Sequence, residues 1–300
     1  MGATLALLAL PLGVAVPAVA APAPTSIVAA SHATAVTPSA VSRVVSGAVS
    51  SAAATAAPGV ARGDDPTTAP LAAQRAGVLA AGAAAPRSMP DWFTGPRLDG
   101  VDVSAWDGPV SWSAHRAKGV SFAWVKATEG KAWRSSTFAT QYAGAARHGV
   151  LRGAYHFARP ANSGGVTQAR FFVRNGGAWR ADGRTLPGAL DLEMPPSGDD
   201  CYGMSPAALR AWIGDFTREY RRLTGRNAII YTTNYWWRTC TGNTTAFAAT
   251  HRLWLARYST TPGTIPGGWA RPSVWQYSED VMDKNVWFGS AASLRAWARG

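Results

Sequence analysis

Short apolar segments alternate with helix-like patterns from about residue 97 to the end of the chain. Eight segments have the composition of strands, the last of them weakly: 100–104, 121–127, 151–158, 188–194, 228–233, 253–258, 273–278 and a stretch near Val286. Helical spacing is expected up to residue 118 and over 137–148, 166–173 and 205–224, with little helical signal between the last strands. Alternation of this kind predicts an α/β fold with a parallel sheet and right-handed crossovers. We therefore expect a barrel whose last strands lack crossover helices.

The helix expected over 205–224 has the clearest boundaries. Ser205 is suited to the N-cap, Pro206 to the first helical position and Gly225 to the position just past the end. Its aromatic and aliphatic residues recur at helical spacing, which indicates a face packed in the core rather than a ligand site.

One expected strand, Gly188–Met194, carries two acids inside an apolar run. Asp191 and Glu193 are two residues apart, so in a strand both side chains point to the same face. Two buried like charges are costly, and one carboxyl is then pushed towards its protonated form while the other stays ionised. That division suits a general acid with a carboxylate helper. The alternative is a strand end at which both acids reach water or cap the next helix.

Polar residues gather where the expected strands end. In a barrel of parallel strands, the carboxyl ends of the strands line the active site. The residues at or near these ends are Asp102, Lys126, Tyr155, Asp191, Glu193, Tyr231 and Gln276. This convergence indicates catalysis.

The first part of the chain has a different composition. No aromatic residue precedes Trp92, and a segment so poor in large apolar side chains cannot bury enough surface to fold. Residues 1–20 resemble a secretory signal peptide, with an apolar stretch and a small-residue cleavage site at Ala18-Val19-Ala20. No Lys or Arg precedes that stretch, so the natural start could lie upstream, and a retained N-terminal anchor is the alternative. We expect a disordered linker or pro-segment over 21–96 and one folded domain over 97–300.

The two cysteines, Cys201 and Cys240, are expected to form a disulfide, because an exported protein keeps such pairs oxidised. As metal ligands they lack a CxxC spacing or a nearby His, so neither a metal nor a cofactor is expected. The chain has 29 Lys and Arg against 17 Asp and Glu. This charge favours polyanionic surroundings, but no basic block, helix-turn-helix or aromatic RNA motif indicates nucleic acid. A bacterial wall or membrane surface fits an exported basic protein better.

Five blocks occur in an order and spacing that resemble the glycoside hydrolase family 25 muramidases, the lysozymes of the bacterial wall. They are Gly100-Val-Asp-Val-Ser-Ala-Trp106, Phe122-Ala-Trp-Val-Lys-Ala-Thr-Glu-Gly130, Gly153-Ala-Tyr-His-Phe157, Leu190-Asp-Leu-Glu193 and Trp275-Gln-Tyr-Ser278. The resemblance covers about residues 98–300. It implies an irregular TIM-like barrel, with about five helices around about eight strands. It also implies hydrolysis of the β-1,4 bond between N-acetylmuramic acid and N-acetylglucosamine.

Carried over by position, Glu193 matches the proton donor of the family and Asp191 matches the assisting carboxylate. Asp102 matches the aspartate of the first strand, and Asp283 matches a late aspartate near the site. The residue after Trp106, a Gln in the family, is Asp107 here. Asp191 either orients the 2-acetamido group of the substrate or acts directly on water or the sugar, and the sequence leaves this open.

Tyr155, Tyr231 and Trp275 are candidate sugar-stacking walls, with Gln276 beside them. His156 follows Tyr155 on the strand, so it faces away from the site and is expected to be structural. From these features we expect a secreted, cell-wall-associated monomer that acts on peptidoglycan, with no stable membrane insertion once the signal is removed.

Three other enzyme classes fit the sequence less well. A chitinase-type barrel would need acids where Leu186 and Ala189 stand. A zinc amidase or peptidase would need clustered ligands, and a serine hydrolase would need a GxSxG turn; both patterns are absent from the sequence. A basic, aromatic module that binds wall glycan without cutting it remains the alternative from another class.

Overall fold

The computed structural model describes residues 94–280 and 282–300. The expected signal peptide and all but the last residues of the expected linker lie outside this part of the chain. The strands are β1 (Arg97–Val103), β2 (Phe122–Glu129), β3 (Trp133–Arg134), β4 (Leu151–Phe157), β5 (Ala189–Leu192), β6 (Ile229–Thr233), β7 (Leu253–Ala256), β8 (Val274–Ser278) and β9 (Asp283–Phe288).

The α-helices are α2 (Trp112–Ala117), α3 (Phe138–Arg147), α4 (Gly165–Phe172), α5 (Pro206–Thr224), α6 (Asn234–Thr241) and α7 (Ala291–Arg299). Three shorter helical turns are η1 (Ala105–Asp107), η2 (Pro160–Asn162) and η3 (Val173–Gly177). The caps of α5 are those expected: the Ser205 side chain accepts a hydrogen bond from the Ala208 amide, and Gly225 adopts a φ of 74°.

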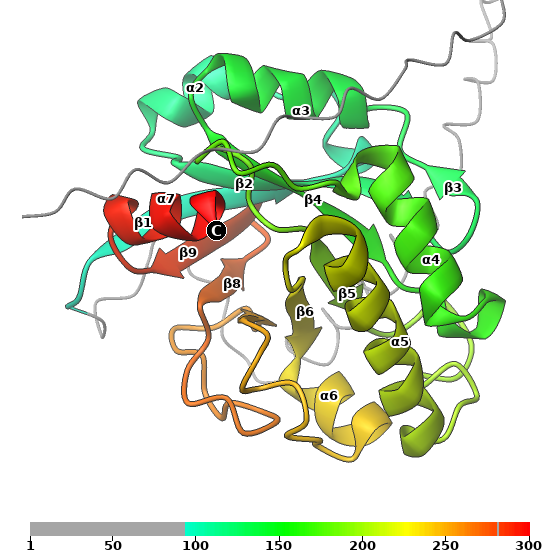
Figure 1. The fold of residues 1–300 in the computed structure, drawn as a ribbon. Helices are drawn as coiled ribbons and strands as arrows, with labels where there is room; N and C mark the ends of the chain where they lie inside the picture. Colours follow the sequence, from blue (N-terminus) through cyan, green and yellow to red (C-terminus); the bar gives the residue numbers. More distant parts are fainter. Residues whose placement is uncertain (1–93, 281) are drawn as a thin grey trace, which may run out of the picture. The chain divides into compact units, whose positions relative to one another are not determined.

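Eight strands close into a barrel, as expected from the alternating pattern. The sheet order is β1-β9-β8-β7-β6-β5-β4-β2, and β1 also pairs with β2, which completes the circle. β3 pairs with the end of β2 as a short antiparallel extension. Figure 1 shows α3, α4 and α5 on the outside of this sheet, while the chain between β7 and β8 passes without a helix.

The direction of the last strand differs from the expected parallel sheet. β9 runs antiparallel to both of its neighbours, β8 and β1. The reason is the connection: only residues 279–282 separate β8 from β9, whereas a parallel pair needs a crossover of a dozen residues or more. The pattern also did not locate α6 and α7, which are short helices of eight and nine residues.

Apolar side chains fill the barrel and the layer between barrel and helices. The interior cluster includes Phe122, Trp124, Trp254 and Trp287, and Trp124 and Trp254 have ring centroids 4.9 Å apart. A Cβ at Gly153 would lie 2.3 Å from the Trp124 ring, so this close approach requires glycine. No helix within the described ranges is both long and apolar enough to cross a membrane.

We call the end of the barrel at which the parallel strands finish the mouth, and the opposite end the base. Because β9 is antiparallel, it finishes at the base, and α7 follows it two residues later. Leu294 and Ala298 of α7 belong to the interior cluster, so this helix covers the base.

Candidate active site

The paired acids lie at the mouth, at the end of β5. Asp191 pairs in register with Phe157 of β4 and with Tyr231 of β6, and Glu193 follows directly after the strand. The residues are only 5% and 4% exposed, respectively. Burial raises the pKa of Asp191 well above its usual value of 3.8, and the nearby Glu193 carboxylate raises it further, while the Lys126 charge opposes the rise. The pair is therefore arranged to hold a proton at a pH where an ordinary aspartate has lost it.

One oxygen of Asp191 lacks a hydrogen-bond partner among the described residues. Its Oδ1 is buried and accepts no hydrogen bond from the part of the chain that the structure describes. A buried acceptor without a partner costs free energy, so such an atom at a mouth indicates a position completed by substrate.

Asp102 is the centre of a hydrogen-bonded network beside the pair. The side-chain amides of Gln276 and Asn285 both donate to its Oδ1, at 2.9 and 2.6 Å. Gln276 Oε1 in turn accepts from the Tyr231 hydroxyl at 2.8 Å. Burial raises the pKa of Asp102 to about 7, although the two amide donors act against the rise. This network joins four strands and fixes the wall of the site.

A second charged network lies between β2 and β4. Lys126 Nζ donates to Glu129 Oε2 at 2.7 Å, and Arg159 binds Glu129 Oε1 at 2.6 Å. Lys126 is fully buried, and its charge faces Asp191. A register shift between Lys126 and Thr128 lets Lys126 and Glu129 meet despite their odd spacing.

A cavity of about 560 Å³ opens beside these groups. Its lining includes Glu129, Trp133, Arg159 and Tyr202. The described surface has three exposed large apolar residues, and two of them follow strand ends at the mouth: Trp106, 48% exposed, after β1, and Tyr235, 54% exposed, after β6. A cavity and exposed aromatic rings at the same end of a barrel are suited to a chain of sugars.

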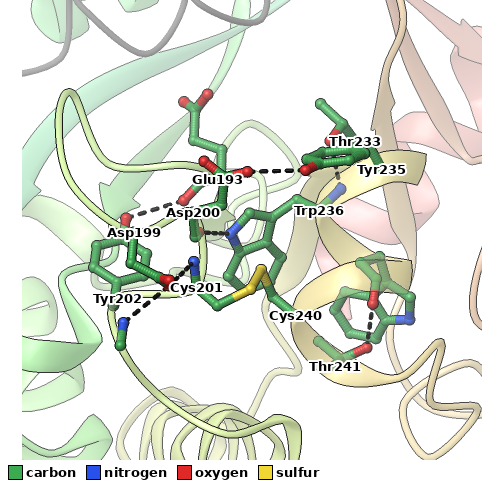
Figure 2. Close-up of a disulfide and its surroundings, with 12 residues drawn as sticks. Glu193, Asp199, Asp200, Cys201, Tyr202, Thr233, Tyr235, Trp236, Cys240 and Thr241 are labelled. Atoms are coloured by element: carbon green, nitrogen blue, oxygen red, sulfur yellow. Dashed lines mark hydrogen bonds between the residues drawn. A yellow bond between two sulfur atoms is a disulfide. The ribbon is translucent and has the colours of Figure 1, made fainter.

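A disulfide-bonded loop supports the backbone of Glu193. Cys201 and Cys240 are bonded, as expected, and link the loop after β5 to α6. Next to Cys201, the Tyr202 hydroxyl lies 3.0 Å from the carbonyl oxygens of both Glu193 and Ala158 (Figure 2). Tyr202 has a φ of 62°, which is rare for a bulky residue. The disulfide and the hydroxyl together hold the end of β5 in place.

The same loop is tied to α6 on its other side. The Asp200 carbonyl accepts from Trp236 Nε1 at 2.9 Å, and the Asp200 carboxylate accepts from the Tyr235 hydroxyl at 2.9 Å (Figure 2). The exposed Tyr235 ring is therefore held by the structure that carries the disulfide.

The structure brings most of the expected site residues together, but not all. Tyr155 is half-buried and packs against the interior cluster. Asp283 is also half-buried and lies opposite Asp102 in the register of β9 and β1. Tyr231 belongs to the network, yet it is 4% exposed and its ring packs on Trp254.

Trp275 is not part of the site. It is fully buried on the outer face of β8 with Tyr277, Val286 and Phe288, and its Nε1 donates to the Arg257 carbonyl. The reason is the alternation of a strand: Gln276 points into the barrel, so its neighbour must point out. Trp275 is therefore not available to stack on a sugar.

Sequence reasoning missed the residues that depend on irregular features. Glu129 and Arg159 join the site through the register shift in β2 and the loop after β4. Asn285 lies on the weakest strand pattern and Tyr258 lies beyond β7, although its hydroxyl also donates to Gln276. The sequence held one signal for the network of Glu129 and Arg159: Lys126, a charged residue within an apolar strand.

His156 is structural, as expected. It is fully buried with its ring nitrogens 2.8 Å from Thr128 Oγ1 and 2.9 Å from Gln168 Oε1. Burial lowers its pKa to about 4, so the ring stays neutral.

Comparison with known proteins agrees with this geometry. The sequence profile of glycosyl hydrolases family 25 matches residues 101–286. The chain is 44% identical over 209 residues to Lysozyme M1 of Streptomyces globisporus, which covers 67% of this chain and 71% of that protein. It is 41% identical over 210 residues to the N,O-diacetylmuramidase of Chalaropsis sp, covering 68% of this chain and all of that one. The solved GH25 lysozyme of Aspergillus fumigatus has 44% identity and a TM-score of 0.67 over 68% of this chain and all of that chain.

Proposed function

The chain belongs to glycosyl hydrolases family 25 and is a peptidoglycan muramidase, and from that premise we propose how its residues carry out the reaction. The observation that carries the proposal is the buried pair of acids at the mouth, next to a cavity and exposed aromatic rings. Glu193 is the general acid that protonates the glycosidic oxygen between N-acetylmuramic acid and N-acetylglucosamine. Asp102 and its amide partners shape the wall opposite.

Asp191 assists from the neighbouring position. Its buried Oδ1, which accepts nothing from the described residues, suits the N–H of the substrate's 2-acetamido group. An acetamido group oriented in this way can attack the anomeric carbon as the bond to the leaving oxygen breaks, with the proton coming from Glu193. The positive charge that develops lies close to the Asp191 carboxylate and is stabilised by it when that group is ionised.

Trp106, Tyr235 and Trp133 are the proposed sugar-contacting rings, together with Tyr155. The first two are exposed at the mouth, and Trp133 lines the cavity. Tyr231 and Trp275, expected from the sequence to stack on sugars, are enclosed by the protein instead. The enzyme is proposed to act as a secreted monomer at the cell wall, without nucleic acid and without membrane insertion.

The test is digestion of purified peptidoglycan by the full chain, with the new reducing ends identified by mass spectrometry. Muramic acid ends are expected. Ends of N-acetylglucosamine would contradict the bond specificity, and a folded, wall-bound protein that releases no ends would make it a binding module.

The role of Asp191 has its own test. A glycan from which the acetyl group at the cleavage site has been removed should be cut much more slowly if the acetamido group takes part. Equal rates on the two glycans would show that the acetamido group takes no part, and Asp191 would then act directly on water or on the sugar.

A further inference from the structure

The base of the barrel carries a charge that the muramidase reaction does not use. Two cavities open on either side of α7, since Trp297 lines one and Arg295 lines the other. The first, of about 300 Å³, is lined by Gly225, Asn227, Thr250, Trp297 and three arginines, Arg221, Arg226 and Arg252. The second, of about 320 Å³, includes four arginines, Arg147, Arg152, Arg184 and Arg295. No acid lines either cavity within the described ranges.

The arginines of the first cavity bind neutral partners. Arg221 donates to Asn227 Oδ1 at 3.0 Å, Arg226 to the Trp297 carbonyl at 3.0 Å and Arg252 to Ser273 Oγ at 3.3 Å. None of the three has a carboxylate within 4.0 Å in residues 94–280 and 282–300. In the second cavity, Arg152 does have Asp182 at 3.9 Å. Among the described residues, the other three arginines of the second cavity have no carboxylate within 4.0 Å either, so both cavities carry positive charge that no nearby acid offsets.

Mutual repulsion shows in the electrostatics of Arg252. Burial lowers its pKa, and the positive charges of Arg226 and Arg271 lower it further. Helix ends account for only part of the cluster: Arg221 lies in the last turn of α5 and Arg226 binds the Trp297 carbonyl at the end of α7, but Arg252 binds the Ser273 side chain instead. An anion in the cavity would relieve this repulsion.

We propose that the base binds a linear phosphodiester polyanion of the cell wall, with a phosphate in the cavity formed by Arg221, Arg226 and Arg252. Guanidinium groups match phosphate oxygens with paired hydrogen bonds, and three of them around one cavity make a strong anion site. A flexible chain with repeated phosphates can place one in each of the two cavities, which open on either side of α7. The wall as the source of this polymer rests on the proposed function.

Binding at the base would leave the mouth open for glycan. An enzyme held by one polymer of the wall while it cuts another keeps a high local concentration of substrate. This gives the positive charge of the domain a role separate from hydrolysis.

The experiment measures binding of the full chain to poly(glycerol phosphate) by calorimetry at low salt. The test variant, Arg221→Gln with Arg252→Gln, should weaken binding by about tenfold or more. The matched control, Arg174→Gln with Arg238→Gln, removes the same charge from exposed positions that line neither cavity and should weaken binding less than threefold. Equal losses in the two variants would overturn the proposal, because they would show a general charge effect.

Arg252 also packs against the rings of Trp287 and Trp297, so its loss could disturb the fold. A second variant, Arg221→Gln with Arg295→Gln, takes one exposed charge from each cavity and should also weaken binding more than the control does. If it binds as the wild type does, the proposed site is wrong.

Two further probes separate the alternatives. Tighter binding to anionic lipid vesicles or to duplex DNA than to poly(glycerol phosphate) would overturn the choice of partner. Hydrolysis of soluble glycan fragments should be unchanged in the base variants. Because poly(glycerol phosphate) is not a substrate, its binding can succeed even if the muramidase mechanism fails, and the reverse also holds.

Discussion

At the mouth of the barrel, acids are buried and held by amides, a lysine and an arginine; at the base, arginines line open cavities around a helix that covers the barrel. Asp102 accepts two side-chain hydrogen bonds, and Glu129 is bound by both Lys126 and Arg159. The three arginines of the first cavity at the base bind only neutral groups. The difference teaches that the mouth pairs most of its buried charged groups but leaves Asp191 Oδ1 without a partner among the described residues, whereas the arginines at the base bind neutral groups and stay open to an anion.

The largest effect should come from Glu193→Gln, which should abolish activity at the mouth without changing binding at the base. The amide cannot deliver a proton, so kcat on peptidoglycan should fall roughly 10³-fold or more. Binding of poly(glycerol phosphate) at the base should stay within twofold of the wild type. Reducing-end assays measure the rates, and circular dichroism confirms that the variant is folded. A folded variant that still clears cell walls would show that Glu193 is not the general acid.

The second-largest effect should come from removal of the disulfide, which tests how far the structure of the mouth depends on this bond. The double variant Cys201→Ser with Cys240→Ser frees a loop with a sequence separation of 39. The chain-entropy model gives a loss of about 4 kcal/mol in the free energy of unfolding, measured by urea denaturation. Activity at temperatures where the variant is folded should fall as well, because the loop carries Tyr202. Unchanged stability would mean that the loop is fixed by its hydrogen bonds alone.

Asp102→Asn tests the cost of burying an acid at the mouth. The folded pKa of Asp102 is raised from 3.8 to about 7, so its contribution to stability is full at low pH and is lost as pH rises through this interval. The wild type should therefore lose about 4 kcal/mol relative to Asp102→Asn between pH 4 and pH 8. Denaturation of both proteins across this range measures the difference. Parallel curves would show that the Asp102 carboxyl is not desolvated.

Tyr202→Phe should have the smallest effect and concerns the position of Glu193. Without the hydroxyl, the Glu193 carbonyl loses its donor, and kcat should fall about tenfold while KM changes little. Steady-state kinetics on soluble glycan fragments make the measurement. A change confined to KM would place Tyr202 in the substrate cavity, which it also lines, rather than behind the general acid.

The parts of this fold that follow from local pattern could be predicted. The strand that carries Asp191 and ends just before Glu193, and α5 with its Ser205 cap and Gly225 end, each have a signal confined to a few residues. The direction of β9 could not be read, since its pattern is weak and direction depends on a connection of four residues.

The site also combines residues that the local pattern predicts with residues that it does not. Asp102, Gln276 and Tyr231 were expected at strand ends, and the structure joins them in one network. Trp275 and Gln276 were both expected to face the substrate, although neighbours on a strand point to opposite faces. The contacts of Glu129 require a register shift, and such shifts leave no clear mark in a single sequence.

The central claim is that the mouth keeps a proton on its buried pair of acids. Carboxyl ¹³C resonances of Asp191, followed by NMR across pH in the wild type and in Glu193→Gln, test it most directly. The pKa of Asp191 should lie well above 3.8 in the wild type, because burial disfavours its charge. It should fall, but stay raised, in Glu193→Gln, where the like charge is gone. An Asp191 that titrates near 3.8 in the wild type would contradict the account.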